Sequence, residues 1–206
     1  MVDLRKTYIF RITHIENIPH IIQYGITHVN SENANPNYVP IGDSSIISTR
    51  ETFKYFNDRN IGEYIPFYFA VRTPMLYVIQ KGFNWVPPTP PEKIVYCVSS
   101  VQSVLDLKLN IVFTDGHAID RFTSFYTESD IQKLNKIIDK RAINAKYWND
   151  ENDLDLKRRK EAEFLVLGDI EPQAILGFVV FNEKARQILV DYGVSKQIVI
   201  KPDYYF

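Results

Sequence analysis

The sequence is poor in cysteine, in excess charge and in long apolar runs. Cys97 is the one cysteine among 206 residues, which excludes an internal disulfide framework and a thiolate zinc site and favours a reducing compartment, the cytoplasm. No stretch approaches the roughly 18 apolar residues of a spanning helix, and the first residues lack a signal core, so we expect no membrane role. With 24 basic and 25 acidic residues, the net charge of −1 argues against a uniformly basic surface.

Several catalytic motifs are missing as well. The chain has no G-x-x-x-x-G-K-[ST] loop, no G-x-G-x-x-G fingerprint and no G-x-S-x-G elbow, which removes the key residues of common nucleotide-binding and serine-hydrolase sites. Its four histidines form no H-E-x-x-H pair, so we expect no metal. What the chain does have is 45% hydrophobic residues, enough for the core of one domain over residues 1–206, and 14% aromatic residues, which fill cores or stack on flat ligands.

The hydrophobic pattern predicts strands and helices in irregular order. Alternation and apolar content predict strands at 8–14, 64–70, 93–98, 110–113, 163–167, 174–181 and 197–201. Helices are predicted at 17–24, toward Phe56 behind a Ser44 or Ser45 cap, at 128–143 behind a Thr127 cap, and at 182–192. A loop rich in Asn and Pro spans 27–43, and 75–79 is a further apolar run. Because strands and helices do not alternate regularly, we expect an α+β fold.

Four polar residues have more than one interpretation. Strand alternation puts Glu163 on the face of Leu165, where a carboxylate must be paired or must face a cleft, although Glu163 could equally begin the strand in solvent. His117 follows an Asp-Gly turn and could be a site residue or an inert surface histidine. Arg50 could belong to a solvated helix face, and His14 could be a satisfied histidine at a strand end.

A basic segment lies between these residues. Residues 133–160 hold nine basic and five acidic residues, which leaves the rest of the chain acidic. Tyr147 and Trp148 lie in its polar part, and basic residues around exposed rings suit single-stranded nucleic acid. An ordinary solvated helix followed by a loop, with Trp148 packed on the body, explains the same pattern equally well.

An ordered set of motifs resembles a known family. The motifs are Ile12-Thr13-His14-Ile15-Glu16-Asn17-Ile18-Pro19, the 41–50 segment, Tyr64-Ile65-Pro66-Phe67-Tyr68-Phe69 with Pro74-Met75-Leu76-Tyr77, Phe113-Thr114-Asp115-Gly116-His117-Ala118 and Ala162-Glu163-Phe164-Leu165. Together they resemble the DarT family of toxins, which transfer ADP-ribose from NAD to a base of single-stranded DNA and are countered by a macrodomain antitoxin. The resemblance implies the ADP-ribosyltransferase fold, a mixed, split central sheet around an NAD cleft with flanking helices.

The resemblance also implies roles for particular residues. Glu163 and Arg50 match the catalytic glutamate and arginine, residues 30–50 the NAD-binding loop and helix, and residues 117–163 the substrate-recognition region. The expected NAD contacts are Thr13, His14, Ile15, Asn17, Ile41, Gly42, Tyr68 and Met75. The expected DNA contacts are His117, Tyr147, Trp148 and Arg158.

The function implied is that of a toxin-type transferase in the cytoplasm. We expect it to modify a base, thymine first, of single-stranded DNA in a sequence-specific way and to release nicotinamide, with a macrodomain antitoxin as its partner. Two alternatives remain: an enzyme of the same fold that modifies RNA or protein or hydrolyses NAD, and a catalytically silent nucleic-acid-binding module.

Overall fold

A central mixed sheet organises the structure, a computed structural model that describes residues 2–55 and 59–206. Within these residues eight strands form one sheet in the order β10-β9-β5-β1-β4-β8-β6-β7, and β2 pairs with β3 separately. The strands are β1 Tyr8–His14, β2 Lys54–Tyr55, β3 Arg59–Asn60, β4 Ile65–Tyr68, β5 Ile94–Ser100, β6 Asn110–Thr114, β7 Phe125–Thr127, β8 Glu163–Leu167, β9 Gly177–Val180 and β10 Gln197–Ile200.

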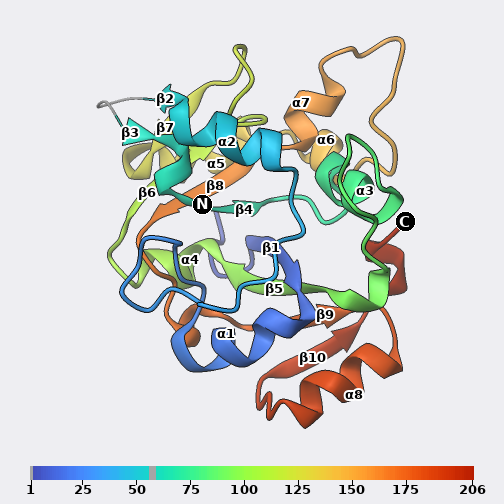
Figure 1. Cartoon of the computed structure of the whole chain (residues 1–206). Coiled ribbons are helices and arrows are strands. Elements are labelled where there is room, and N and C mark those ends of the chain that lie inside the picture. Colours follow the sequence, from blue (N-terminus) through green and yellow to red (C-terminus); the bar gives the residue numbers. More distant parts are fainter. Residues whose placement is uncertain (1, 56–58) are drawn as a thin grey trace.

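The sheet divides between β1 and β4. Across the described residues β1 pairs with β5 over its whole length, whereas β1 and β4 share the single pair of Phe10 and Tyr68. Neighbouring strands are antiparallel except β9 and β10, which are parallel. Figure 1 shows the two halves, with β1, β5, β9 and β10 below and β4 and β8 above. A split therefore opens beside the carboxyl end of β1.

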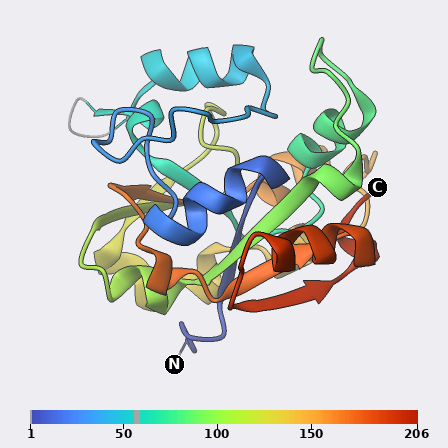
Figure 2. The same cartoon turned by 60° about the horizontal axis from the view of Figure 1, so that its bottom comes forward.

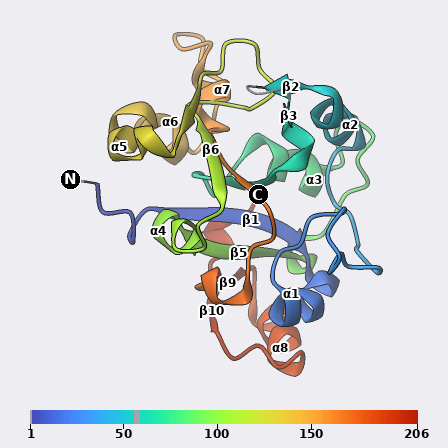
Figure 3. The ribbon, with the colours of Figure 1, turned by 90° about the vertical axis from the view of Figure 1, so that its left-hand side faces the viewer.

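Short helices flank both halves. They are α1 Ile18–Tyr24, α2 Ser44–Thr52, α3 Pro74–Lys81, α4 Val101–Leu105, α5 Leu134–Ile137, α6 Lys140–Asn144, α7 Leu156–Lys160 and α8 Glu183–Asp191, with 3₁₀ turns η1 Ile15–Asn17, η2 Ile61–Glu63, η3 Pro91–Lys93, η4 Glu128–Lys133, η5 Pro172–Ala174 and η6 Pro202–Tyr204. Figure 2 shows α1 and α8 covering the lower half, and Figure 3 shows α2 and α5 on opposite sides of β6.

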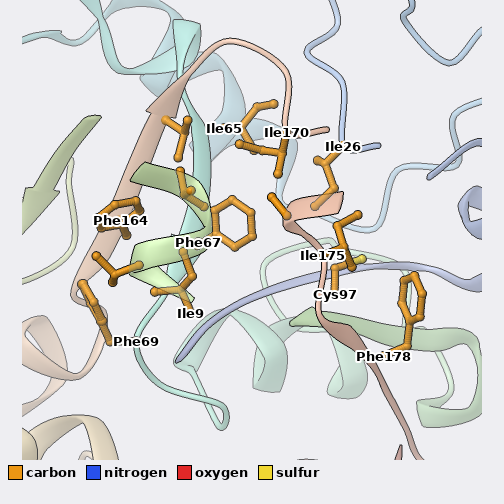
Figure 4. Packing of buried hydrophobic residues seen from close by; sticks show 14 of the residues in the cluster. Ile9, Ile26, Ile65, Phe67, Phe69, Cys97, Phe164, Ile170, Ile175 and Phe178 are labelled. Carbon is orange, nitrogen blue, oxygen red and sulfur yellow. The ribbon is translucent and has the colours of Figure 1, made fainter. Parts of the chain in front are cut away.

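The largest hydrophobic cluster joins the two halves of the sheet. Ile9 from β1, Phe67 from β4 and Phe164 from β8 are fully buried within it, as Figure 4 shows. A second cluster forms under α3 around Tyr96, and a third holds Ile61 and Leu165. The burial of these large side chains removes enough apolar surface from water to stabilise a sheet whose two halves share little hydrogen bonding.

Most expected strands are confirmed within two or three residues at their ends, and the expected helices at 17–24 and 182–192 are confirmed as α1 and α8. The predicted continuous helix at 128–143 is wrong. It is broken into η4, α5 and α6 because the Asp139 carboxylate accepts the N–H groups of Arg141 and Ala142 and starts a new helix there. The predicted serine cap of α2 is also wrong, since Asp43 caps it. Residue 56, the expected end of that helix, lies outside the described residues. The apolar run at 75–79 lies in α3, where Leu76 and Ile79 are buried.

Candidate active site

Glu163 lies at the start of β8 and is completely buried. Side chains alternate along a strand, so Phe164 and Val166 enter the main core while Glu163 shares the opposite face with Leu165, which packs with Ile61 of η2. The interpretation of Glu163 as a solvent-exposed strand start is therefore wrong. A buried carboxylate needs partners, and the surrounding loops supply them.

Two N–H donors hold the Glu163 carboxylate. The Arg50 guanidinium donates from Nη1 to Oε2 over 2.9 Å, and the backbone N–H of Ala118 donates to Oε1 over 2.8 Å. The His117 Nε2 lies 4.0 Å from Oε1. Residues that are 113 positions apart in the chain are therefore joined in one buried cluster, which we call the Arg50–Glu163 pair.

Arg50 has donor capacity left over. Its Nη2 atom is buried and has no hydrogen-bond partner among the described residues. A buried guanidinium nitrogen without an acceptor is costly, and a phosphate or carboxylate oxygen is the acceptor that suits its fork geometry. The solvated-face interpretation of Arg50 is wrong, because the side chain is buried and paired with Glu163.

A close contact of α2 with η2 fixes Arg50 in this position. A Cβ atom on Gly62 would lie 2.9 Å from the Glu51 Cα and 3.1 Å from the Arg50 carbonyl oxygen. The residues of α2 around Arg50 are exposed, so the helix packs mainly through Arg50 itself. Glycine at position 62 therefore lets α2 approach closely enough for Arg50 to reach Glu163.

The turn after β6 is bound to the start of β8. Thr114 accepts the Glu163 N–H at its Oγ1 over 3.0 Å and donates to the Gly116 carbonyl over 2.6 Å. The His117 N–H donates to the Arg158 carbonyl over 3.0 Å, and a Cβ on Gly116 would clash with the Arg158 side chain. This packing holds the His117–Ala118 peptide against Glu163, and His117 is a partly buried neighbour of the carboxylate rather than an inert surface histidine.

Asn17 connects β1 to the long loop at 27–43. Its Nδ2 donates to Thr13 Oγ1 over 3.0 Å and to the Val39 carbonyl over 2.9 Å, while its Oδ1 accepts the Val39 N–H over 2.8 Å. Asn17 is fully buried and Thr13 nearly so. Two of the expected NAD contacts thus position the expected NAD-binding loop through their side chains.

The other expected NAD contacts near the split differ in exposure. His14 caps η1 by accepting the Glu16 N–H at Nδ1, so its proton sits on Nε2, and burial lowers the pKa of the ring below the ordinary value. Ile15 and Ile41 are buried in hydrophobic clusters, which leaves their backbone groups for contacts. Gly42 lies just before Asp43, the cap of α2.

Tyr68 and Met75 lie beside the Arg50–Glu163 pair. Tyr68 is the register partner of Glu163 across β4 and β8, and its hydroxyl donates to the Met75 Sδ atom over 3.6 Å. Burial, with Glu163 next in effect, raises the pKa of Tyr68 well above its usual range. The phenol is therefore neutral, and Tyr68 with Met75 forms a largely apolar wall near the carboxylate.

The expected DNA contacts lie in two places: His117 and Arg158 line one groove together, whereas Tyr147 and Trp148 lie in the loop after α6. Arg158 is largely buried and pairs with Asp115 at 2.9 Å and Asp155 at 2.7 Å, so it ties the His117 turn to α7. Trp148 is half-buried against Tyr77 and Phe206, which confirms the interpretation that it packs on the body. Tyr147 is 67% exposed. Of the three, Tyr147 is the one whose ring faces solvent.

Acidic side chains within the expected basic segment and directly beside it pair with most of its cations. Five of its cations are paired: Lys133 with Asp130, Arg141 with Asp150, Lys157 with Glu161, Arg158 with Asp155, and Arg159 with Asp139. Lys160 is buried and donates to the Ala145 carbonyl, and burial lowers its pKa to about 8. The segment is therefore cross-linked by ion pairs and offers few free cations to a nucleic acid.

Two surface grooves flank the site. One of about 460 Å³ lies between α1 and the 27–43 loop, and one of about 430 Å³ lies beside His117 and α7. Within residues 2–55 and 59–206 there is no cluster of three His, Cys, Asp or Glu side chains suited to a metal ion. In the same residues, every helix falls short of the length and apolar content needed to cross a membrane.

Three elements of the site escape sequence reasoning. They are the Ala118 N–H on Glu163, the Val39 backbone held by Asn17, and the close approach allowed by Gly62. Every residue except proline has a backbone N–H, so the sequence does not predict that Ala118 and Val39 make these hydrogen bonds. Gly62 is the one detectable signal, because an isolated glycine between the predicted helix toward Phe56 and the predicted strand at 64–70 indicates a turn or a close contact.

Comparisons with known proteins agree on one family. The model of the family described as DarT, ssDNA thymidine ADP-ribosyltransferase, matches residues 10–206. The structure of Thermus sp. 2.9 DarT in complex with ADP-ribosylated ssDNA superposes with a TM-score of 0.83 at 29% identity, covering 97% of this chain and 96% of that one. The same protein in complex with NAD+ gives 0.78 over 97% and 98%. A Thermosipho africanus DNA ADP-ribosyl transferase-DNA ADP-ribosyl glycohydrolase fusion protein is 28% identical over 95% of this chain and 48% of its own length.

Proposed function

The chain belongs to the DarT family of ssDNA thymidine ADP-ribosyltransferases, and we propose that Glu163 and Arg50 carry out its reaction. The enzyme transfers ADP-ribose from NAD to a base of single-stranded DNA, and NAD is its second substrate. The observation that supports the two roles is the buried contact of 2.9 Å between Arg50 and Glu163, with Arg50 Nη2 left without an acceptor.

Glu163 is proposed to stabilise the breaking glycosidic bond. In the transfer, the bond from the ribose anomeric carbon to nicotinamide breaks, a bond from that carbon to a thymine nitrogen forms, and the thymine proton is released. Positive charge builds on the ribose as nicotinamide leaves, so a carboxylate bound to the 2′-hydroxyl stabilises the transition state more than the ground state. Fixed by Ala118 and Arg50, the carboxylate needs no reorganisation when this charge appears.

Arg50 is proposed to hold anionic oxygen and to polarise the acceptor base. Its Nη1 is bound to Glu163, whereas the buried Nη2 is available to a phosphate oxygen of NAD. The cation also lowers the cost of losing the thymine proton, but a guanidinium stays protonated near neutral pH and is unsuited to act as a full base. His14, with a proton on Nε2, is suited to donate to a ribose oxygen, and Tyr68 with Met75 to flank the flat nicotinamide.

Residues 30–50 are proposed to close over NAD and residues 117–163 to select the acceptor strand. The first segment is attached to β1 by Asn17 and carries Arg50 at its end. The second begins at His117, 4.0 Å from Glu163, and ends at Glu163 itself. A recognition segment bound directly to the catalytic carboxylate suits a sequence-specific enzyme, because the selected base is then held next to the reacting atoms.

We expect Asn17→Ala to weaken NAD binding without removing the chemistry. The change leaves the Val39 N–H and carbonyl without their partner, which frees the loop and costs about 1–3 kcal/mol of stability. Steady-state assays should show the KM for NAD raised about 10-fold and kcat little changed, since 1.4 kcal/mol corresponds to a factor of ten. Asn135→Ala, an exposed change on α5, is the matched control. An unchanged KM for NAD would remove the loop from the NAD site.

A direct assay tests the proposed function. Purified protein is incubated with NAD and single-stranded oligonucleotides of mixed sequence, and the products are analysed by mass spectrometry with mapping of the modified base. We expect an ADP-ribose adduct on thymidine in a limited set of sequence contexts, with one nicotinamide released per adduct. Modification of RNA or protein in the absence of any DNA adduct would overturn the assignment.

A macrodomain antitoxin and a cytoplasmic location complete the proposal. The Thermosipho africanus relative joins a DNA ADP-ribosyl transferase to a DNA ADP-ribosyl glycohydrolase in one chain, and we infer that a separate de-ADP-ribosylating partner serves this chain as part of a toxin–antitoxin pair. NAD and DNA, the two substrates, occur together in the bacterial cytoplasm.

A further inference from the structure

The loop after α3 presents an unusual tryptophan. Trp85 is fully exposed, and it and Asn84 have positive φ angles of 64° and 56°. A left-handed conformation costs roughly 1–2 kcal/mol for a residue with a Cβ, and an exposed indole gains nothing from burial. Folding alone therefore gives no reason for a tryptophan at this position, whereas contact with a flat ligand does.

The loop is nevertheless firmly attached. Gly82 ends α3 by donating its N–H to the Val78 carbonyl over 2.9 Å, and Phe83 stacks on Tyr77 with ring centroids 5.4 Å apart. The Asn84 side chain lies near the Asp43 carboxyl and is one of the polar groups that lower its pKa. Figure 2 shows this loop, in green between α3 and β5, projecting from the body at the side of the cyan helix α2. A fixed loop that projects a ring into solvent is organised for binding before its ligand arrives.

The same contacts connect the loop to the Arg50–Glu163 pair. Asp43 caps α2, the helix that carries Arg50. Met75, on α3, contacts Tyr68, the strand partner of Glu163. The loop therefore follows α3, which carries Met75, and lies near Asp43 at the start of α2, which carries Arg50.

Aromatic rings continue from this loop to the recognition segment. Tyr77, under Phe83, also meets the Trp148 ring edge-on at 5.6 Å, and Tyr147 follows with 67% of its surface exposed. Phe83 is itself half exposed. We call the exposed rings of Phe83, Trp85 and Tyr147 the aromatic surface. Tyr77 contacts both Phe83 of the loop and Trp148, the neighbour of Tyr147, so the rings of the two segments are connected through Tyr77.

The charges around these rings suit a phosphate backbone. Residues 82–91 contain no charged side chain, the exposed Lys81 directly precedes this loop in the chain, and the Lys146 Nζ lies 5.6 Å from the centroid of the Tyr147 ring. In the recognition segment, Asp150 is paired with Arg141. Single-stranded nucleic acid is bound by rings that stack on bases together with cations that meet phosphates.

We propose that Trp85, supported by Phe83 and Tyr147, stacks on bases of the acceptor DNA strand that flank the modified thymidine. This inference rests on the proposed function, because that function makes single-stranded DNA the substrate. A strand held at its flanking bases presents the target base to Glu163 with less loss of freedom at the reactive step. Because every base has a stacking face, the aromatic surface raises affinity for longer strands and leaves the choice of target base to residues nearer Glu163.

The test combines Trp85→Ala with the conservative Trp85→Phe. Binding of a fluorescein-labelled single-stranded oligonucleotide of mixed sequence is measured by anisotropy, and transfer is measured with NAD on the same oligonucleotide and on a thymidine-containing trinucleotide. We expect Trp85→Ala to raise the Kd and KM for the long strand about 10-fold, with kcat, the KM for NAD and activity on the trinucleotide unchanged. Trp85→Phe should retain most of the affinity, because a phenyl ring still stacks.

Tyr8→Ala, which removes a half-exposed ring at the start of β1, is the control and should change neither constant. Equal affinity of wild type and Trp85→Ala for the long strand would overturn the proposal. A raised KM for NAD with unchanged DNA binding would also overturn the proposal, because it would assign Trp85 to the binding of the dinucleotide. The same holds if Trp85→Ala weakens only the binding of protein substrates and leaves DNA binding unchanged. Failure of the wild type to modify any oligonucleotide would refute the proposed function, while the anisotropy comparison would still report on Trp85.

Discussion

Glu163→Gln is expected to reduce ADP-ribose transfer by about 10³-fold or more while the protein stays folded. The amide has the size of the carboxylate and keeps an oxygen for the Ala118 N–H, but it lacks the negative charge that stabilises the developing positive charge on ribose. Removal of one preorganised electrostatic contact of this kind typically costs about 10²–10³ in kcat. Single-turnover assays with NAD and oligonucleotide measure the loss directly.

The controls for Glu163→Gln separate chemistry from structure. Circular dichroism should match the wild type, while thermal unfolding should show a lower Tm because the amide leaves the buried Arg50 guanidinium without its counter-charge. The Kd for DNA should be retained because the Ala118 N–H keeps an oxygen acceptor and the His117 turn stays in place. Glu161→Gln is the neighbouring comparison, since that carboxylate is buried but pairs with Lys157 in place of Arg50. Wild-type turnover by Glu163→Gln, or an equal loss in Glu161→Gln, would contradict the role assigned to Glu163.

Arg50→Ala is expected to reduce ADP-ribose transfer to within about 10²-fold of the Glu163→Gln level and, like that variant, to destabilise the fold. Arg50 is the one side-chain donor to the Glu163 carboxylate among the described residues, so its removal leaves a buried charge with the Ala118 N–H alone. Breaking a buried ion pair from one side costs about 3–5 kcal/mol. Denaturant unfolding measures this loss, and kcat and the KM for NAD measure the loss of function.

A double variant distinguishes the electrostatic effect from simple loss of packing. Combining Arg50→Ala with Glu163→Gln removes the unpaired buried charge. The double variant should therefore recover a large part of the free energy of unfolding lost in Arg50→Ala. Activity should remain absent, because both groups are missing. Additive stability losses in the double variant would mean that the two side chains do not interact in solution as the 2.9 Å contact indicates. Arg50→Lys, which keeps the charge without the fork of donors, should fall between wild type and Arg50→Ala in KM for NAD.

Strand prediction succeeded where the pattern was local and strong. Alternation from Tyr8 to His14 and the apolar run after Glu163 placed β1 and β8 without error, because each face of these strands meets a distinct environment. The helix predicted at 128–143 failed because apolar spacing carries no information about where a side chain such as Asp139 competes for backbone N–H groups. The five apolar residues at 75–79 fit a buried helix as well as a strand, because so short a run matches both patterns, and the structure places them in α3.

The candidate site was predictable in its residues and unpredictable in its contacts. The ordered motifs pointed to Glu163 and Arg50, and the family comparison agrees with the resemblance. That Glu163 also accepts the Ala118 N–H, and that Asn17 serves the 27–43 loop through Val39, depends on backbone groups that every residue has. Such contacts leave no trace in the order of side chains.

Local pattern and motif order were enough to establish an α+β domain, its principal strands and its family. The charged residues are unevenly distributed along the chain, with an excess of four basic residues in 133–160. This excess does not produce a cationic surface, because folding pairs Arg158 and Arg159 with aspartates and buries Lys160. Composition counts charges without the distances between them, and the energy of a charge depends on those distances and on its exposure to water. The two tryptophans also have opposite environments: Trp148 packs against Tyr77, whereas Trp85 is exposed to solvent. The sequence does not separate them, because only folding brings distant segments of the chain together.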